Sequence, residues 1–503
     1  MRNQFNMTNI CADCLVEIAL GRNAGNAEDA RRNLHEWITS YTEDSELGAM
    51  LFSPNYHVSY IPVKSWDMLW LRKDGSTPKY EDFDYDDWNK EYLRAHELGI
   101  EPYKIAIEET HKAGVEAWFS VRMNEFHYLR YPHDSASLWN ERPDLRMAED
   151  KAFDYAKKEV RDYYLAYIRE LCESYDVDGV ELDMWRGPEF FNPPITAQKV
   201  QIITDFLKEI RAAVNCIAAK KGKKIRISAR TDIHPNLALK RGWDSAQWIA
   251  DGSVDVLTLA VFWVPSPCEV FVKEWVERIA AKGGRRDQYG LNVCADSANF
   301  CMKYNEPGIK WLKPDTVNLK GFAATHFDRG VDGLYTFNIN NRDYQLPREN
   351  REVDFTVFMS KGKVRKGERR HILAYNEENP ANRAQLKALL APGESLELKL
   401  HTSTAPQKGR YVVEIGINQP EACLGMKLNG KVCRYIGKPE GPAYEAAGAK
   451  NVKAISEVAP NVLLYEPVTL DGIVDGENVF EIQNKGRDSV EITWFSVDAE
   501  NEC

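Results

Sequence analysis

The chain up to about residue 345 alternates short apolar runs with longer segments whose apolar residues recur every three or four positions. Short runs of this kind are typical of buried strands, and the longer segments are typical of amphipathic helices. Strands that alternate with helices predict parallel strands joined by right-handed crossovers. The expected strands are Cys14–Leu20, Gly48–Tyr56, Val115–Met123, Asp178–Met184, Lys224–Thr231, Val254–Phe262, Tyr289–Ala295 and Asp332–Ile339.

The segments between these runs predict helices. Eight strand and helix units over roughly 330 residues match an α/β fold of the (β/α)8 TIM barrel type, enlarged by insertions. Three of these strands carry an aspartate at their entry, Asp178, Asp255 and Asp332. These positions lie at the N-terminal end of the predicted barrel, so we expect turn and capping roles there. The expected helices are Ala27–Thr39, Trp88–Ala113, Lys157–Tyr175, Ala197–Lys220, Pro235–Ala250, Glu269–Lys282 and Asp315–Arg329.

The pattern changes near Arg369 to short segments in which apolar and polar residues alternate, with almost no helical period. Turn signals such as Asn429-Gly430, Asp471-Gly472 and Asp475-Gly476 lie among them. This pattern predicts a small antiparallel β-sandwich of the jelly-roll kind. We therefore expect a barrel over residues 1–353, a connector over 354–370 and a sandwich over 371–503. The expected sandwich strands are Ser395–Thr402, Tyr411–Asn418, Met426–Cys433, Asn461–Pro467, Asn478–Gln483 and Val490–Ser496.

Composition narrows the functional classes. The net charge of −11 disfavours nucleic-acid binding, which relies on a basic surface. No apolar run is long enough to cross a membrane, and the N-terminus lacks the apolar stretch of a signal peptide. The ten cysteines follow no disulfide framework, which favours a reducing compartment. We expect a cytoplasmic protein, with a mature secreted or periplasmic form as the alternative; assembly into a homo-oligomer stays open.

The segment VDGVELDMWRGPEFF, residues 177–191, is the most informative part of the chain. Alternate residues of a strand point to opposite faces, so Glu181 and Asp183 share the inner face of the barrel. Two carboxylates on the inside of an apolar strand are costly unless they are paired or used. Asp183 ends its strand, at the C-terminal side where barrels hold their active sites. Asp183 is therefore the first candidate for a catalytic residue.

The neighbouring strands follow the same logic. The third and fifth predicted strands read VEAWFSVRMNEFH and KIRISARTDIH. In both, alternation places arginines on the inner face and puts an acid and a histidine at the end of the strand. Three strands with acid, arginine and imidazole at one end are a stronger signal than any one of them. Besides those of the central strand, the side chains expected at this end are Arg122, Asn124, Glu125, His127, Arg230, Asp232 and His234.

These residue types suit the cleavage of a glycosidic bond. That reaction uses a protonated carboxyl that donates to the leaving oxygen and an ionised carboxylate that attacks the sugar or activates water. We expect Asp183 to be the nucleophile or base, with Glu125 as the first choice for the acid and Asp232 as the second. Glu181 lies one layer deeper and is expected to pair with an arginine inside the barrel, while Arg226 is expected in a structural salt bridge.

Further side chains are expected to bind a carbohydrate, and no cofactor is predicted. Histidines here lack the spacing of metal motifs, and the Cys11/Cys14 pair has no second pair, so no metal site is predicted. Aromatic walls with a few polar groups are typical of sugar pockets. At most half of the following residues are expected to be sugar platforms: Trp118, Trp185, Phe190, Phe191, Trp263 and Tyr335. The predicted substrate-binding residues are Arg122, Asn124, His127, Glu181, Trp185, Arg186, Arg230, His234, Trp263 and Asn338.

Three stretches of the chain carry a family resemblance: SVRMNEFH, DYAKKEVRDYYLAYIRELCESYDVDGVELDMWRGPEFF and SARTDIHPNLALKRGWDSAQWIADGSVDVL. Together they resemble a group of bacterial glycoside hydrolases similar to the family-ten-like glycosyl hydrolases. The resemblance covers roughly residues 45 to 345 and implies a barrel with a glycosidase site centred on Asp183. Glu125 stands where the group more often has aspartate. The seventh strand, LNVCAD, offers Asp296 as its only acid, so the chemistry of true family-ten xylanases is not expected.

Two other functions stay open. A non-catalytic glycan-binding protein on the same scaffold would keep the aromatic residues and arginines but turn over no glycan. A lyase or metal-dependent hydrolase would lose its activity to a chelator. The fold alone does not decide among them, because barrels support many reactions.

Overall fold

The computed structural model divides into two compact units, Met1–Phe262 with Phe271–Asn292 and Tyr335–Gln345, and Trp263–Val270 with Val293–Leu334 and Leu346–Cys503. The predicted domain limits at residues 353 and 371 stay a prediction. The residues that the structure describes are 3–21, 24–78, 87–125, 135–148, 151–260, 270–296, 302–303, 309–310, 315–339, 343–351, 353–373, 385–386, 388–406, 408–417, 419, 421–438 and 461–501.

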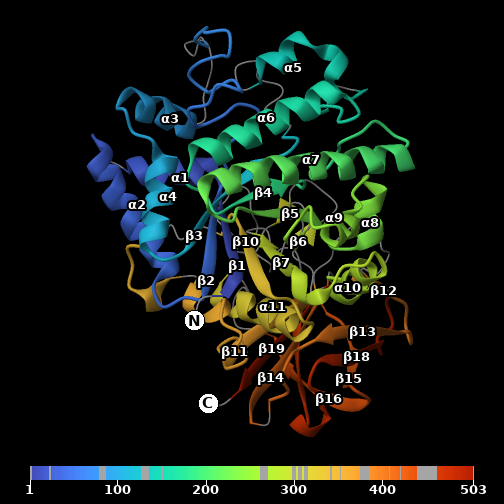
Figure 1. Cartoon of the computed structure of the whole chain (residues 1–503). Coiled ribbons are helices and arrows are strands. Elements are labelled where there is room, and N and C mark those ends of the chain that lie inside the picture. The colour runs from blue at the N-terminus through green and yellow to red at the C-terminus, as the bar shows by residue number, and fades with distance from the viewer. Residues whose placement is uncertain are drawn as a thin grey trace. The chain divides into compact units, whose positions relative to one another are not determined.

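Eight parallel strands close into a barrel in the order β1-β10-β7-β6-β5-β4-β3-β2, which confirms the predicted TIM barrel (Figure 1). Residues on the inner face of one strand meet those of its neighbours in register, and this places the side chains discussed below. The barrel strands are β1 Asn3–Ile10, β2 Leu47–Phe52, β3 Glu116–Arg122, β4 Gly179–Asp183, β5 Arg226–Asp232, β6 Val256–Ala260, β7 Gly290–Asp296 and β10 Gly333–Phe337.

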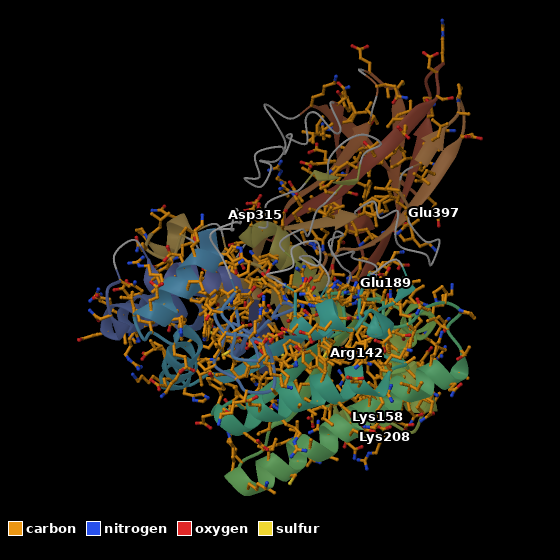
Figure 2. The ribbon with its side chains drawn as sticks, turned by 90° about the horizontal axis from the view of Figure 1, so that it is seen from above. Arg142, Lys158, Glu189, Lys208, Asp315 and Glu397 are labelled. Carbon is orange, nitrogen blue, oxygen red and sulfur yellow. The ribbon has the colours of Figure 1, made fainter. Side chains whose placement is uncertain are left out.

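Helices follow the strands as the apolar periodicity predicts, and α6 packs against α7 (Figure 1). Their outer faces carry charged side chains such as Lys158 and Lys208 (Figure 2). Among the described residues, 3-10 turns lie at Pro143–Leu145, Arg286–Gln288, Arg348–Asn350 and Leu470–Gly472. The helices are α1 Ala12–Leu20, α2 Ala27–Thr42, α3 Asp87–Glu97, α4 Pro102–Lys112, α5 Ser137–Glu141, α6 Lys158–Ser174, α7 Ala197–Lys221, α8 Pro235–Lys240, α9 Ser245–Ala250, α10 Val272–Ala281, α11 Thr316–Asp328 and α12 Phe355–Phe358.

The first predicted strand is wrong. Residues 14–20 belong to helix α1, and the barrel instead begins with β1, whose sequence NQFNMTNI reads as polar. Asn6, Thr8 and Asn9 of this strand are nonetheless fully buried. An apolar run of seven residues cannot be assigned to a strand or a helix from its pattern alone.

Two predicted helices are each divided into two. The segment 88–113 forms α3 and α4, and 235–250 forms α8 and α9. Gly99 and Gly242 lie between the halves with φ of +66° and +93°, a conformation that ends a helix and that glycine adopts without strain.

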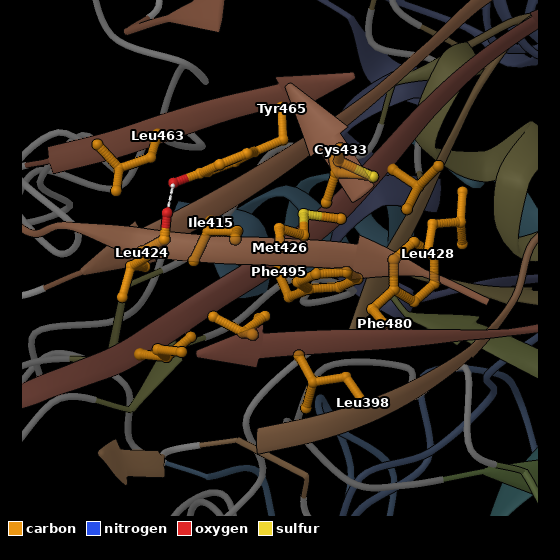
Figure 3. Close-up of a cluster of buried hydrophobic side chains, with 14 of the residues drawn as sticks. Leu398, Ile415, Leu424, Met426, Leu428, Cys433, Leu463, Tyr465, Phe480 and Phe495 are labelled. Carbon is orange, nitrogen blue, oxygen red and sulfur yellow. Dashed lines mark hydrogen bonds between the residues drawn. The ribbon is translucent and has the colours of Figure 1, made fainter. Parts of the chain in front are cut away.

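The C-terminal strands form one antiparallel sheet in the order β11-β19-β14-β17-β16-β15-β18-β13, with β12 beside β19. Side chains from both ends of this sheet meet in one apolar core, in which the Phe480 and Phe495 ring centroids lie 4.9 Å apart (Figure 3). The predicted sandwich is therefore confirmed. Its strands are β11 Gly367–Leu373, β12 Ala388–Leu390, β13 Ser395–His401, β14 Gly409–Ile417, β15 Leu424–Leu428, β16 Lys431–Gly437, β17 Asn461–Pro467, β18 Glu477–Asn484 and β19 Val490–Asn501. A two-residue pair, β8 Met302–Lys303 with β9 Ile309–Lys310, lies apart from it.

Two sandwich elements differ from the predictions. The segment 426–433 is a hairpin of β15 and β16 that turns at Asn429-Gly430, where the turn signal itself had predicted a break. Strand β11 begins at Gly367, inside the segment predicted as a connector, and pairs along its length with β19. Helix α11 packs on β11 so closely that a Cβ atom on Gly321 would lie 1.8 Å from the Arg370 carbonyl oxygen.

Candidate active site

Strands β3, β4 and β5 align their inward residues in two rows across the barrel. Asp183 lies in register with Arg122 and Arg230, at the C-terminal ends of the strands. One layer deeper, Glu181 lies in register with Ser120 and Ser228. All of these side chains are buried, and the alternation in the sequence predicts their common direction.

Asp183 accepts four hydrogen bonds. Arg230 donates from Nε to Oδ1 at 2.9 Å and from Nη2 to Oδ2 at 3.1 Å. The backbone N–H groups of Trp185 and Arg186 donate to Oδ1 at 3.1 and 3.2 Å. Because every partner is a donor, the arrangement suits an ionised carboxylate. Asp183 is 0% exposed, and the Arg230 guanidinium lies 4.0 Å from the centroid of the Phe337 ring.

Glu125 follows β3 and is held by two arginines. Arg122 Nη1 donates to Oε2 at 2.7 Å, and Arg186 Nε lies 3.5 Å from the same oxygen. The Arg122 guanidinium also lies 3.7 Å from the centroid of the Tyr56 ring. Glu125 is the first choice of the sequence analysis for the proton donor, and that role stays a prediction.

Asp232 ends β5 and has a weaker arginine contact. Arg241 Nε donates to its Oδ2 at 3.2 Å, and the His234 backbone N–H donates to Oδ1. Burial raises the pKa of Asp232 to about 6, although Arg241 acts to lower it. Arg241 is itself 34% exposed and lies 4.5 Å from the centroid of the Trp185 ring. Asp232 is thus a carboxyl group that holds a proton up to mildly acidic pH.

Within the described residues Glu181 forms no ion pair with an arginine, although one was predicted for it. Its Oε1 atom accepts hydrogen bonds from Ser120 Oγ at 2.7 Å, Tyr335 Oη at 2.6 Å and Asn9 Nδ2 at 3.4 Å. Burial and the nearby charge of Asp183 raise the pKa of Glu181 to about 7, against the opposing effects of Arg230 and of the hydroxyl donors. Tyr335 therefore lies inside the barrel below the mouth and is not a sugar platform.

Several other predicted binding residues have structural contacts. The Asn124 amide bonds the backbone of Phe153 and the Glu189 carbonyl, so it ties neighbouring segments together. His234 Nδ1 accepts the Asn236 N–H and caps helix α8. Asn338 Oδ1 accepts the Cys11 thiol proton. Trp185, Phe190 and Phe191 are buried, as is Trp118 near the opposite end of its strand. His127 and Trp263 lie outside the described residues.

Cys11, which the sequence analysis considered only as a metal ligand, belongs to this cluster together with three side chains that were not predicted for it. Cys11 lies just beyond β1, where Arg122 Nη2 is 3.4 Å from its sulfur and burial raises the pKa of the thiol to about 11. The other three lie against residues described above: Tyr56 against Arg122, Phe337 against Arg230 and Arg241 against Trp185. Tyr56 is the last residue of the predicted strand Gly48–Tyr56, and Phe337 lies near the end of the predicted strand Asp332–Ile339, so position at a strand end is the signal that could have indicated these two.

The opposite, N-terminal end of the barrel carries paired charges. Asp178 Oδ2 accepts the Ala117 N–H at 3.0 Å and contacts His111 Nε2 at 2.7 Å, while Asp255 Oδ2 accepts the Ile227 N–H. Both aspartates therefore bind the edge of the preceding strand, in the capping roles predicted for them. A cavity of about 370 Å³ at this end is lined in part by Glu116 and Arg226, which form an ion pair with each other.

Among the residues that the structure describes, no three His, Cys, Asp or Glu side chains gather as a metal site would require. No helix in the described part of the chain is long and apolar enough to cross a membrane.

No family model matches the chain. Glycosyl hydrolase YngK of Bacillus subtilis (strain 168) is 26% identical over 224 residues, which cover 36% of this chain and 42% of that protein. The match thus spans less than half the length of this curated relative. Among solved structures, the PgaB (BpsB) glycoside hydrolase domain from Bordetella bronchiseptica has a TM-score of 0.44 at 12% identity, covering 71% of this chain and 98% of that one. The GH27 β-L-arabinopyranosidase Abp from Geobacillus stearothermophilus has a TM-score of 0.38 at 10% identity, covering 99% and 97%. In part of its length, the chain is similar to a protein named a glycosyl hydrolase.

Proposed function

We propose that the chain is a glycoside hydrolase that cleaves an oligo- or polysaccharide at the C-terminal end of strands β3, β4 and β5. One observation carries the proposal: Asp183 and Asp232 end adjacent strands, and their surroundings favour opposite protonation states. The name of the curated relative supports the reaction class. Membership of the family-ten-like group is part of the same proposal.

The roles follow from the contacts. Asp183, held by Arg230 and two backbone N–H groups, is the nucleophile or base. Asp232, whose pKa burial raises to about 6, is the acid that protonates the leaving oxygen. Register places Asp232 two residues beyond the partner of Asp183, which separates the two Cα atoms by about 8 Å at a strand spacing of ~4.8 Å and a rise of ~3.3 Å per residue. Glu125 lies between Arg122 and Arg186 and positions these two arginines toward the substrate.

The test is hydrolysis of a panel of aryl glycosides and oligosaccharides by the wild-type chain and by Asp183→Asn. We expect the variant to lose on the order of 10²–10⁴-fold in kcat, since the carboxylate is removed but its shape remains. Asp205→Asn, which changes an exposed acid on α7, is the matched control and should keep the wild-type rate. If Asp183→Asn has the circular dichroism spectrum of the wild type and also its rate of turnover, the assignment of Asp183 is wrong.

One observation favours a second function, glycan binding without catalysis. Asp183 and Glu125 are 0% and 1% exposed, and each is paired with a buried arginine. A closed ion-pair network of this kind also serves to order a barrel interior. Under this alternative the wild-type chain binds an oligosaccharide in calorimetry but hydrolyses none of the panel, at any pH between 4 and 8.

A further inference from the structure

The two acids of strand β4 lie on the same face but in contrasting surroundings. In the upper row Asp183 stands between Arg122 and Arg230, whereas in the lower row Glu181 stands between Ser120 and Ser228. The acids are two residues apart, so their Cα atoms are separated by about 6.6 Å along the strand. Two charges this close in a buried site repel each other, and the upper acid alone has a guanidinium bonded to it.

The hydrogen bonds of Glu181 distinguish its two oxygens. All three donors described above, from β1, β3 and β10, point to Oε1. Oε2 is buried and has no hydrogen-bond partner in the described part of the chain, and neither has the nearby hydroxyl of Ser228. Ionisation of Glu181 would leave Oε2 buried with no donor and no bonded cation among the described residues, whereas a proton on Oε2 removes that charge. The proton then belongs on Oε2, on the side of Ser228.

The charged and titratable groups around Glu181 support this picture. Strand β4 supplies Asp183, strand β5 supplies Arg230, and strand β10 supplies Tyr335. Strands β1 and β3 supply the uncharged Asn9 and Ser120, and β3 also carries Arg122 one layer above, beside Asp183. Arg230 lowers the pKa of Glu181, but burial and Asp183 outweigh it, and the pKa is raised to about 7. The guanidinium that faces both acids makes its direct bonds to Asp183.

We propose that Glu181 is a positioning residue that keeps its proton on Oε2 and so leaves Asp183 as the one charged carboxylate bonded to Arg230. Ionisation of Glu181 places a second negative charge below Asp183 and draws Arg230 away from it. The inference rests on the proposed function for its catalytic consequence, but the coupling between the two acids holds without any turnover.

The coupling can be measured by infrared titration of the whole chain, because a protonated carboxyl and a carboxylate absorb at separate positions. We expect a protonated-carboxyl band with a midpoint near pH 7 that Glu181→Gln removes and that the surface control Asp205→Asn keeps. Asp232, whose pKa is raised to about 6, contributes a separate component that both variants retain. In Asp183→Asn the midpoint of this band moves to lower pH, since the neighbouring charge is gone. In Tyr335→Phe it moves to higher pH, since a donor to the ionised form is lost, and this variant replaces Glu181→Gln if the latter does not fold.

Activity provides the second measurement. With both Asp232 and Glu181 required in protonated form, log(kcat/KM) of the wild-type chain falls with a slope of −2 at alkaline pH. In Glu181→Gln the slope is −1, and at pH 8 this variant exceeds the wild-type value about tenfold, because one unit above a pKa of about 7 only about a tenth of the groups keep their proton.

The outcomes separate the two proposals. A band that Glu181→Gln leaves unchanged, or a midpoint that does not respond to Asp183→Asn, overturns the inference about Glu181 whether or not the chain is an enzyme. An unchanged slope of −2 in Glu181→Gln overturns the catalytic part of the inference. If the infrared titrations show the coupling between Glu181 and Asp183 but the chain hydrolyses no glycan, the inference about the coupling stands and the proposed hydrolase function is wrong.

Discussion

Replacement of Arg230 by methionine tests how far the candidate site depends on its central ion pair. Methionine keeps an unbranched apolar stem beside Phe337 but removes both hydrogen bonds to Asp183. Asp183 would keep two backbone N–H donors and lose its only bonded guanidinium among the described residues. Both partners are almost completely buried, so water does not take the place of the lost donors.

The cost follows from this geometry. Removing one partner of a buried ion pair destabilises a protein by about 3–5 kcal/mol, because the remaining charge is left uncompensated. At about 2–4 °C per kcal/mol for a large domain, Arg230→Met should lower the melting temperature by on the order of 10 °C at pH 7.

Calorimetric melting of four proteins provides the assay: the wild-type chain, Arg230→Met, Asp183→Asn and the double variant. We expect the double variant to melt higher than Arg230→Met, since it contains no unpaired charge. An Arg230→Met protein that melts within about 2 °C of the wild type, or a double variant that melts lower than Arg230→Met, would refute the reasoning. The ion pair would then contribute little, and Asp183 would be stabilised by its backbone donors.

Three further predictions concern other parts of the chain. Gly321→Ala should destabilise the unit that contains helix α11 by about 3 kcal/mol, because the added Cβ would meet a β11 carbonyl oxygen at 1.8 Å. Urea denaturation measures this loss. The control Gly362→Ala, whose Cβ would meet only one side-chain atom at 3.9 Å, should match the wild type. Burial acts to raise the pKa of Asp178, but its hydrogen-bond donors outweigh it and lower the pKa to about 2. Asp178→Asn should therefore cost about 2 kcal/mol at pH 7 and progressively less as the pH falls from about 4 to about 2, and a cost independent of pH would contradict this. Iodoacetamide at pH 8 should label exposed Cys216 well before buried Cys11, whose thiol pKa is raised to about 11; equal labelling of the two in peptide mapping would be inconsistent with the buried position.

The barrel could be predicted because its helices and most of its strands carry clear periods. The alternation around Asp183 was sufficient to place Arg122 and Arg230 beside it, since register in a parallel sheet follows from the position of the strand ends. Strand β1 could not be recognised, because a barrel with a polar interior allows asparagine and threonine on a buried strand. The pattern that marks a strand by its apolar residues does not apply to such a strand.

The details of the candidate site lay beyond the sequence for a different reason. Glu181 meets Tyr335 and Asn9, which are 154 and 172 positions away in the chain. No local pattern reports contacts across the interior of a barrel, so the charge state of this acid depended on partners that only the fold brings together. The same holds for Arg241, which lies beyond a short helix and reaches back to Asp232.

Helix α11 has a consequence for the order in which the chain forms during translation. Ten consecutive residues of this helix, from Asn318 to Phe327, are buried, and part of their cover comes from β11 and from the carbonyl of His401, which accepts the Thr325 hydroxyl. Those partners leave the ribosome after the helix does. At a synthesis rate of about 5–20 residues per second, the roughly 73 residues from the end of α11 to His401 take about 4–15 s. Throughout that interval the nascent helix presents apolar surface that the finished protein hides, which makes it a natural binding segment for a chaperone.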